Sequence, residues 1–137
     1  MAEYLMGIDA GTGSVRVALF DFRGQNRAYA VAEYGTTYPK NGWAEQSDYE
    51  WFEALKKAIP ECIKKAGIAA DNIAAITCDA TTNTLVYLDE NDTSVRPPIL
   101  WMDVRATEEA SFIDTIREEY DATTVSYTHL TLPTIRL

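Results

Sequence analysis

The chain has 137 residues, of which 47% are hydrophobic and 24% are charged, a composition typical of a folded globular domain and not of a disordered segment. Its 21 acidic and 12 basic residues give a formal net charge of −9, which argues against nucleic acid and anionic membranes as partners. No run reaches the roughly 18 apolar residues of a membrane span, and no secretory leader is evident, so we expect a cytoplasmic protein.

The first segments predict an antiparallel meander. Residues 4–9 form a short apolar run that ends at Asp9 before a glycine turn, which is typical of a buried strand. Residues 14–22 and 27–34 alternate, with Val15, Val17 and Leu19 on one face of the first of these segments. Turn-forming residues at 23–26 join the two segments, so all three should pair in chain order.

A long helix should begin at Ser47, because Ser47 and Glu50 have the spacing of a capping box. Apolar residues then recur at helical spacing up to Ala66, and a glycine follows as a stop signal. Pro60 lies inside this stretch and removes one backbone hydrogen bond. We therefore expect a kink or a break near Ala58.

The second half of the chain predicts two strands and a helix. Residues 73–79 are an apolar strand that ends at an aspartate, and residues 84–88 are a strand that runs into a turn at 89–92. Residues 106–120 have near-helical spacing of apolar side chains. Cys62 and Cys78 lie in apolar stretches without metal-binding spacing, so both are expected to be reduced thiols in the core. This order of elements indicates an α/β fold with a mixed sheet.

Residues 9–16 (DAGTGSVR) combine side chains that suit a phosphate ligand. Glycines allow the backbone to approach an anion, hydroxyls donate to phosphoryl oxygens, and a carboxylate can hold a hydrated Mg²⁺. The segment is not a Walker A motif, because no Gly-Lys-Ser/Thr follows, and it is a poor match to the dinucleotide-binding fingerprint.

Residues 8–21 (IDAGTGSVRVALFD) resemble the first phosphate loop of the actin, Hsp70 and sugar kinase superfamily. The resemblance implies a ribonuclease H-like (actin-like ATPase) fold, a mixed sheet with flanking helices, truncated in this chain. It also implies ATP and Mg²⁺ as cofactors, with Asp9 approaching the metal through water. The positions that match its nucleotide contacts are Asp9, Gly11, Thr12, Gly13, Ser14 and Arg16.

Three further segments are similar to segments of the FGGY carbohydrate kinases: residues 41–47 (NGWAEQS), 76–84 (ITCDATTNT) and 98–106 (PILWMDVRA). Carried over, the resemblance implies sugar contacts at Asp79, Ala80, Thr81, Thr82, Trp101 and Asp103. Threonine and aspartate side chains hydrogen-bond sugar hydroxyls, and an indole ring can cover an apolar sugar face.

The residues after the strand at 73–79 narrow the expected substrate. Xylulokinases typically have a glutamine-methionine-histidine pattern there and glycerol kinases an arginine-glutamate pair, whereas this chain has Asp79-Ala80-Thr81. That pattern is more similar to ribulokinases, so we expect a ketopentose such as ribulose, or a related polyol. A xylulokinase-type or glycerol kinase-type enzyme is the alternative. A further alternative is a non-enzymatic actin-like ATP-binding module, which would not need the sugar-side segments.

Residues 1–125 are interpreted as part of an FGGY kinase N-terminal domain. The catalytic base and the adenosine-binding glycines of such kinases belong to later segments, so the chain alone is expected to be inactive, while the full-length protein could form a homodimer. Residues 126–137 (SYTHLTLPTIRL) resemble translated sequencing adapter and are interpreted as a non-native tail. His129 lies in this tail and is assigned no catalytic role.

Overall fold

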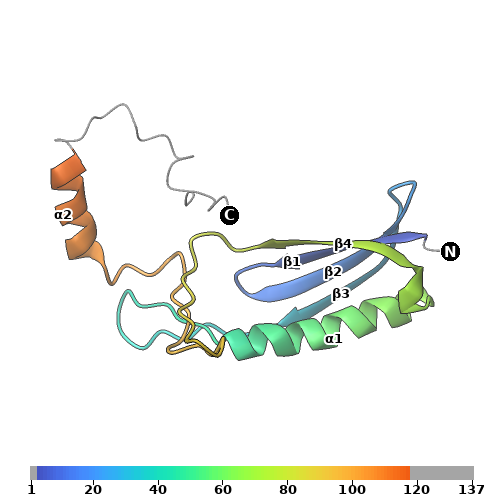
Figure 1. Cartoon of the computed structure of the whole chain (residues 1–137), viewed down its shortest axis with the longest axis horizontal. Coiled ribbons are helices and arrows are strands. Elements are labelled where there is room, and N and C mark those ends of the chain that lie inside the picture. The colour runs from blue at the N-terminus through green and yellow to red at the C-terminus, as the bar shows by residue number, and fades with distance from the viewer. Residues whose placement is uncertain (1–2, 118–137) are drawn as a thin grey trace.

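The computed structural model describes residues 3–117, which form a four-stranded sheet, a long helix packed on it and a second helix beyond it (Figure 1). No helix within this range is long and apolar enough to cross a membrane. The elements in chain order are β1 (Tyr4–Ala10), β2 (Ser14–Asp21), β3 (Asn26–Glu33), α1 (Asp48–Ala66), a short 3₁₀ turn (Ala70–Asn72), β4 (Ile73–Ala80) and α2 (Thr107–Arg117).

The sheet is mixed, as predicted, with the strand order β3-β2-β1-β4. The first three strands form the expected antiparallel meander, and β4 adds to the free side of β1 in parallel. Because β1 and β4 run in the same direction, their carboxyl ends and the segments that follow them meet at one edge of the sheet.

The core lies between α1 and one face of β1, β2 and β3. Val15, Val17 and Leu19 are fully buried there, as the alternation of β2 predicts, together with Met6 and Ile8 of β1. The facing positions of β3 and α1 are small side chains: Ala28, Ala30, Ala32, Ala54 and Ala58. Small residues on both sides allow the helix to pack closely on the sheet.

Helix α1 begins where the capping pattern predicts, since Ser47 Oγ accepts a hydrogen bond from the backbone N–H of Glu50 at 3.4 Å. We expected a kink or a break near Ala58, and a break is excluded, because the helix runs through Pro60 to Ala66 without interruption. Ala58 and Cys62, on either side of the proline, are fully buried against the sheet. Their packing holds the helix together across the missing hydrogen bond.

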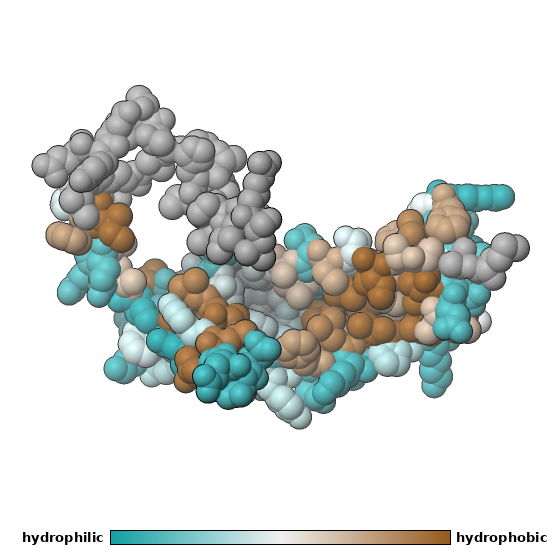
Figure 2. Space-filling model, viewed as in Figure 1, coloured by the Kyte–Doolittle hydropathy of each residue, from teal (hydrophilic) through white to brown (hydrophobic). Residues whose placement is uncertain are grey.

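The two cysteines differ in environment. Cys62 is buried and its thiol donates to the carbonyl oxygen of Val17 at 3.5 Å, and burial raises the pKa of this thiol. The prediction that Cys78 is a core residue is wrong, because Cys78 is exposed on β4. Helix α1 packs mainly over β2 and β3, so the edge strand β4 is left uncovered and Ile76 is 59% exposed. Figure 2 shows apolar side chains gathered on the visible face between β4 and α1.

The segment between β4 and α2 is irregular, so the predicted strand at 84–88 is wrong. Only isolated bridges form there, between Leu85 and Ile99 and between Leu88 and Ser94. The partner stretch contains Pro97 and Pro98, which cannot donate to a ladder and so limit the pairing to single bridges.

The turn predicted at 89–92 is confirmed. Asp89 Oδ1 accepts from the backbone N–H groups of Asn91 and Thr93, at 2.8 and 2.9 Å. Helix α2 falls within its predicted range and leads away from the sheet (Figure 1). Residues 118–120 of that predicted helix, the proposed tail at 126–137 and His129 lie outside the described residues.

Candidate functional site

The turn between β1 and β2 forms the candidate phosphate loop, residues 11–13. The N–H of Gly11 donates to the carbonyl oxygen of Ser14 at 3.0 Å, which closes the turn. A methyl group on Gly13 would meet no atom within 4 Å, so the fold itself does not require glycine at this position. The bare backbone leaves open space for the close approach of an anion. Of the two predicted hydroxyls, Ser14 is buried and Thr12 is half-buried.

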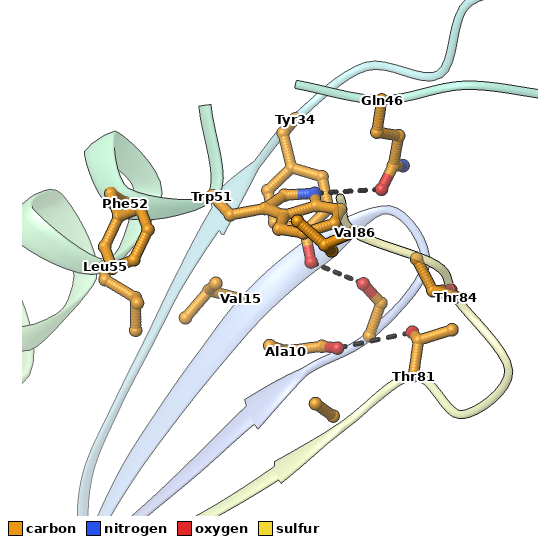
Figure 3. Close-up of a pocket in the computed structure, with 12 residues that line it drawn as sticks. Ala10, Val15, Tyr34, Gln46, Trp51, Phe52, Leu55, Thr81, Thr84 and Val86 are labelled. Carbon is orange, nitrogen blue, oxygen red and sulfur yellow. Dashed lines mark hydrogen bonds between the residues drawn. The ribbon is translucent and has the colours of Figure 1, made fainter. Parts of the chain in front are cut away.

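Two side chains hold the carbonyl groups of this loop from the α1 side (Figure 3). The hydroxyl of Tyr34 donates to the carbonyl oxygen of Gly11, and Gln46 Nε2 donates to that of Thr12 at 2.5 Å. Gln46 is only 4% exposed, and its Oε1 accepts from the indole N–H of Trp51, the fourth residue of α1, at 2.9 Å. The loop is therefore fixed to the start of the helix.

The opposite face of the sheet, which α1 does not cover, carries the predicted charged residues. Asp9 and Arg16 are paired across β1 and β2, with Asp9 Oδ2 2.8 Å from Arg16 Nη1, and their side chains are 46% and 50% exposed. Such an exposed ion pair contributes little to stability, so opening it for a ligand costs little.

Asp79 stands opposite Asp9 in the parallel register of β1 and β4, so the two carboxylates lie on the same face. Asp79 Oδ1 accepts from the N–H of Ala80 at 2.8 Å. Asp9, Arg16 and Asp79 line a shallow hollow of about 340 Å³ on this face.

The predicted sugar-side residues after β4 lie beside the end of β1. Thr81 donates to the carbonyl oxygen of Ala10 twice, from its backbone N–H at 3.0 Å and from its hydroxyl at 3.3 Å. Thr82 is exposed, and its hydroxyl lies 3.5 Å from Asn83 Oδ1. The segment that follows β4 is thus attached directly to the strand that leads into the phosphate loop.

A cavity of about 300 Å³ lies on the α1 side of the same sheet edge (Figure 3). Its walls are mostly apolar: Ala10, Gly11, Val15, Tyr34, Gln46, Trp51, Phe52, Leu55, Ala80, Thr81, Thr84 and Val86. The hydroxyl oxygen of Thr84 is buried without a hydrogen-bond partner in the part of the chain that the structure describes. The sequence patterns did not predict this cavity, because its walls come from four separate segments.

Trp101 and the phosphate loop are in direct contact. The indole N–H of Trp101 donates to Thr12 Oγ1 at 3.2 Å, across 89 residues of sequence. The ring itself is 55% exposed, so it remains accessible to a ligand.

Asp103, in contrast, is directed into the protein, with its side chain 2% exposed. Its Oδ2 accepts from the N–H of Ala44 at 2.7 Å and from Arg105 Nη2 at 2.6 Å, while Oδ1 accepts from Arg105 N and Nε. Hydrogen bonds from the Arg105 guanidinium hold the pKa of the Asp103 carboxyl well below its usual range. Arg105 Nη2 also lies 2.8 Å from Glu45 Oε1, and its guanidinium stacks 3.8 Å from the ring centroid of Trp43.

Residues 44–46, which we call the strap, connect this cluster to the phosphate loop. Ala44 binds the segment around Trp101, because its carbonyl oxygen accepts from the N–H of Leu100 at 3.0 Å and its own N–H donates to Asp103. Gln46, two residues later, holds the carbonyl of Thr12. The same short stretch therefore fixes both partners of the hydrogen bond between Thr12 and Trp101.

The structure thus brings together most of the predicted site residues at the carboxyl ends of β1 and β4. Trp101 contacts Thr12, Thr81 is bonded to Ala10 just before the loop, and Asp9 and Asp79 line the open face of the sheet, whereas Asp103 faces the interior. Sequence reasoning did not assign roles to Tyr34, Glu45, Gln46, Trp51 or Arg105. Three of these residues, Glu45, Gln46 and Arg105, belong to the segments 41–47 and 98–106 that resemble FGGY kinases. That resemblance was the only sequence feature that pointed to them.

The comparisons with known proteins agree with this arrangement. The profile described as "FGGY family of carbohydrate kinases, N-terminal domain" matches residues 4–135. The chain is 32% identical to a glycerol kinase from Oleidesulfovibrio alaskensis over 91% of its own length and 25% of that protein. It is 34% identical to a xylulose kinase from Lactococcus lactis over 80% of its own length and 22% of that protein. The chain therefore spans about a quarter of the length of these curated relatives.

Solved structures are also similar. The crystal structure of a "xyloylose kinase" from Brucella ovis superposes with a TM-score of 0.80 at 29% identity, over 84% of this chain and 24% of that one. That of a gluconate kinase from Lactobacillus acidophilus superposes with a TM-score of 0.78 at 26% identity, over 85% and 23%. The predicted sugar kinase fold is confirmed by these likenesses.

Proposed function

Because the chain belongs to the FGGY family of carbohydrate kinases, we propose that it is the first part of an enzyme that transfers a phosphoryl group from ATP to a hydroxyl of a sugar or related polyol. Such a transfer depends mainly on positioning the two substrates and on stabilising the charge on the phosphoryl group. The phosphate loop and the sugar-side segments of this chain are suited to positioning the two substrates.

One observation carries the proposal: the phosphate loop and the sugar-side segments meet at a single edge of the sheet. Trp101 contacts Thr12, and Thr81 contacts the strand end immediately before the loop. A module that bound only nucleotide would not need an exposed tryptophan at 3.2 Å from its phosphate loop. A kinase needs its acceptor substrate at that place.

On the nucleotide side, we propose that the loop approaches the terminal phosphates, with Thr12 as the more accessible hydroxyl and Arg16 as the cation. The remaining proposed contacts are Asp9, Gly11, Gly13 and Ser14. The residues described contain no cluster of three or more metal-binding side chains. This fits Mg²⁺, which is commonly held by one or two carboxylates together with substrate phosphates and water. Asp9 would hold the ion through water, and the bound ion would neutralise charge on the phosphates.

On the acceptor side, we propose that Asp79, Ala80, Thr81, Thr82 and Trp101 line the sugar site. Asp103 was predicted to belong to this group, but its carboxylate oxygens are already bonded to Ala44 and Arg105. We therefore propose that Asp103 supports the segment that carries Trp101. A ketopentose such as ribulose remains our predicted acceptor, with xylulose and glycerol as the alternatives that the relatives' names suggest.

We further propose that the natural protein continues beyond residue 125 into segments that supply the catalytic base and the adenosine contacts. Its predicted location is the cytoplasm, and the full-length protein could form a homodimer. The 137-residue chain alone should have no kinase activity.

The proposal can be tested by recovering the uninterrupted gene and purifying its product. ADP release would be followed with ribulose, xylulose, gluconate or glycerol as the acceptor, and the 137-residue chain and an Asp9→Asn variant of the longer protein would be compared. We expect acceptor-dependent ADP release from the longer protein alone. ATP hydrolysis that no polyol stimulates would refute the kinase assignment and favour an actin-like ATP-binding module.

A further inference from the structure

We propose that Trp101 is a positioning residue for the nucleotide as well as a wall of the sugar site, because its indole N–H orients the Thr12 hydroxyl toward bound phosphate. The inference rests on the proposed nucleotide site. Its structural basis is the 3.2 Å distance between Trp101 Nε1 and Thr12 Oγ1.

The direction of this hydrogen bond is fixed by chemistry. An indole N–H can only donate, whereas a threonine hydroxyl can donate one hydrogen bond and accept two. With Trp101 occupying one lone pair, the Thr12 hydrogen is directed away from the indole and is free to reach another acceptor. Phosphate oxygens are strong acceptors, and a hydroxyl that already accepts a hydrogen bond is a stronger donor. Trp101 thereby turns a freely rotating hydroxyl into a directed donor.

The contact does not depend on two loose surface side chains meeting by chance. The carbonyl group of Thr12 is held by Gln46, which is almost fully buried. Leu100, immediately before Trp101, is 3% exposed, and its N–H bonds to Ala44. Since Ala44 and Gln46 belong to the same strap, the distance between Thr12 and Trp101 is set by the surrounding fold.

The functional consequence is a link between the two substrates. The exposed face of the Trp101 ring is available to a polyol, while its N–H is committed to Thr12. A change at Trp101 that preserves an aromatic ring should therefore weaken nucleotide binding, which a tryptophan serving only the sugar would not do.

The hydrogen bond can be tested first in the ligand-free 137-residue chain, at a concentration low enough to keep the chain monomeric. It has three tryptophans, so a ¹⁵N-labelled sample gives three indole N–H resonances, and Trp101→Phe identifies the one from Trp101. We expect this resonance to move in Thr12→Val, which has no acceptor oxygen, and to stay close to its original position in Thr12→Ser. An unchanged resonance in Thr12→Val would overturn the proposal.

Mg·ATP is then titrated by calorimetry into the longer protein expressed from the uninterrupted gene, because the adenosine contacts are proposed to lie beyond residue 125. Loss of one hydrogen bond corresponds to roughly a fivefold weaker Kd in Trp101→Phe. In a Thr12→Val background the same change should have no further effect, because the shared hydroxyl is gone. Tyr49→Phe, which loses a polar group on the exposed surface of α1, is the control and should keep the wild-type Kd.

The outcomes separate this inference from the proposed function. If the wild-type longer protein and its Trp101→Phe variant bind Mg·ATP equally well, Trp101 does not position Thr12, although the nucleotide site stands. If the folded wild-type longer protein binds no Mg·ATP at millimolar concentration, the proposed nucleotide site is refuted, and the role of Trp101 with it. Equal weakening by Trp101→Phe with and without the Thr12 hydroxyl would also overturn the proposal.

Discussion

Replacing Asp103 with asparagine removes the negative charge at the centre of the buried cluster that supports the Trp101 segment. The carboxylate receives two charge-assisted hydrogen bonds from the Arg105 side chain, at 2.6 and 2.8 Å, and is 2% exposed. Each such bond contributes about 1.5–3 kcal/mol, and removing one partner of a buried ion pair costs about 3–5 kcal/mol. Because Arg105 keeps its contact with Glu45, we expect a loss of about 3 kcal/mol for Asp103→Asn.

The pH dependence of the free energy of unfolding provides a second test of the role of Asp103. The pKa of Asp103 is lowered in the folded chain, chiefly by hydrogen bonds from Arg105. A carboxyl with a lowered pKa stabilises the fold above its unfolded pKa of about 4, and that contribution is lost as the pH falls below this value. The stability difference between wild-type chain and Asp103→Asn should therefore be largest near neutral pH and should shrink below about pH 4.

Urea unfolding followed by tryptophan fluorescence at low protein concentration measures both effects. Glu61→Gln is a suitable control, because Glu61 pairs with Lys65 on the exposed surface of α1 and its loss should leave the midpoint unchanged. If Asp103→Asn unfolds at the wild-type urea concentration at pH 7, or if the difference is the same at pH 3 and pH 7, the cluster does not support this segment.

Three further outcomes are expected. Gly42→Ala should destabilise the chain by about 1–3 kcal/mol, since Gly42 has a φ of +76° and an added methyl group would lie 2.7 Å from Val104. Gly35→Ala is the control in the same unfolding assay and should be near neutral, because a methyl group added there would meet no atom within 4 Å. Gly13→Ala should retain the wild-type unfolding midpoint, because the added methyl group meets no atom of the fold. In the longer protein the same change should weaken Mg·ATP binding roughly tenfold by calorimetry, because the methyl group fills space left open for phosphate; an unchanged Kd would show that no phosphate approaches there. The 137-residue chain should self-associate in gel filtration through its uncovered β4, and Ile76→Lys should shift the profile toward monomer; a wild-type monomer at high concentration would contradict this.

The parts of the fold that the sequence predicted are those set by local signals. The alternation of Val15, Val17 and Leu19 indicated which face of β2 is buried, and the spacing of Ser47 and Glu50 indicated where α1 begins. The phosphate loop was recognised from eight consecutive residues. These signals act over a few residues, so no tertiary contact is needed to recognise them.

The supporting residues of the site could not be predicted in the same way. Gln46 bonds to a residue 34 positions away, and Tyr34 to one 23 positions away. Asp103 was predicted from its residue type to face a sugar, but whether a carboxylate faces a ligand or a neighbouring arginine depends on how distant segments pack. The continuity of α1 through Pro60 likewise reflects burial against the sheet, which overrides local propensity.

The strand order has a consequence for how the chain assembles. All the fully buried members of the main core come from β1, β2, β3 and α1, which are complete by residue 66, and β4 attaches to them through β1 alone. A nascent chain can therefore close this core during translation, before β4 has left the ribosome, because the contacts it needs are close in sequence. Pairing of β4 with β1 then follows, and residues 98–106 pack on the strap later still, so the proposed active site is completed only after its phosphate loop is in place.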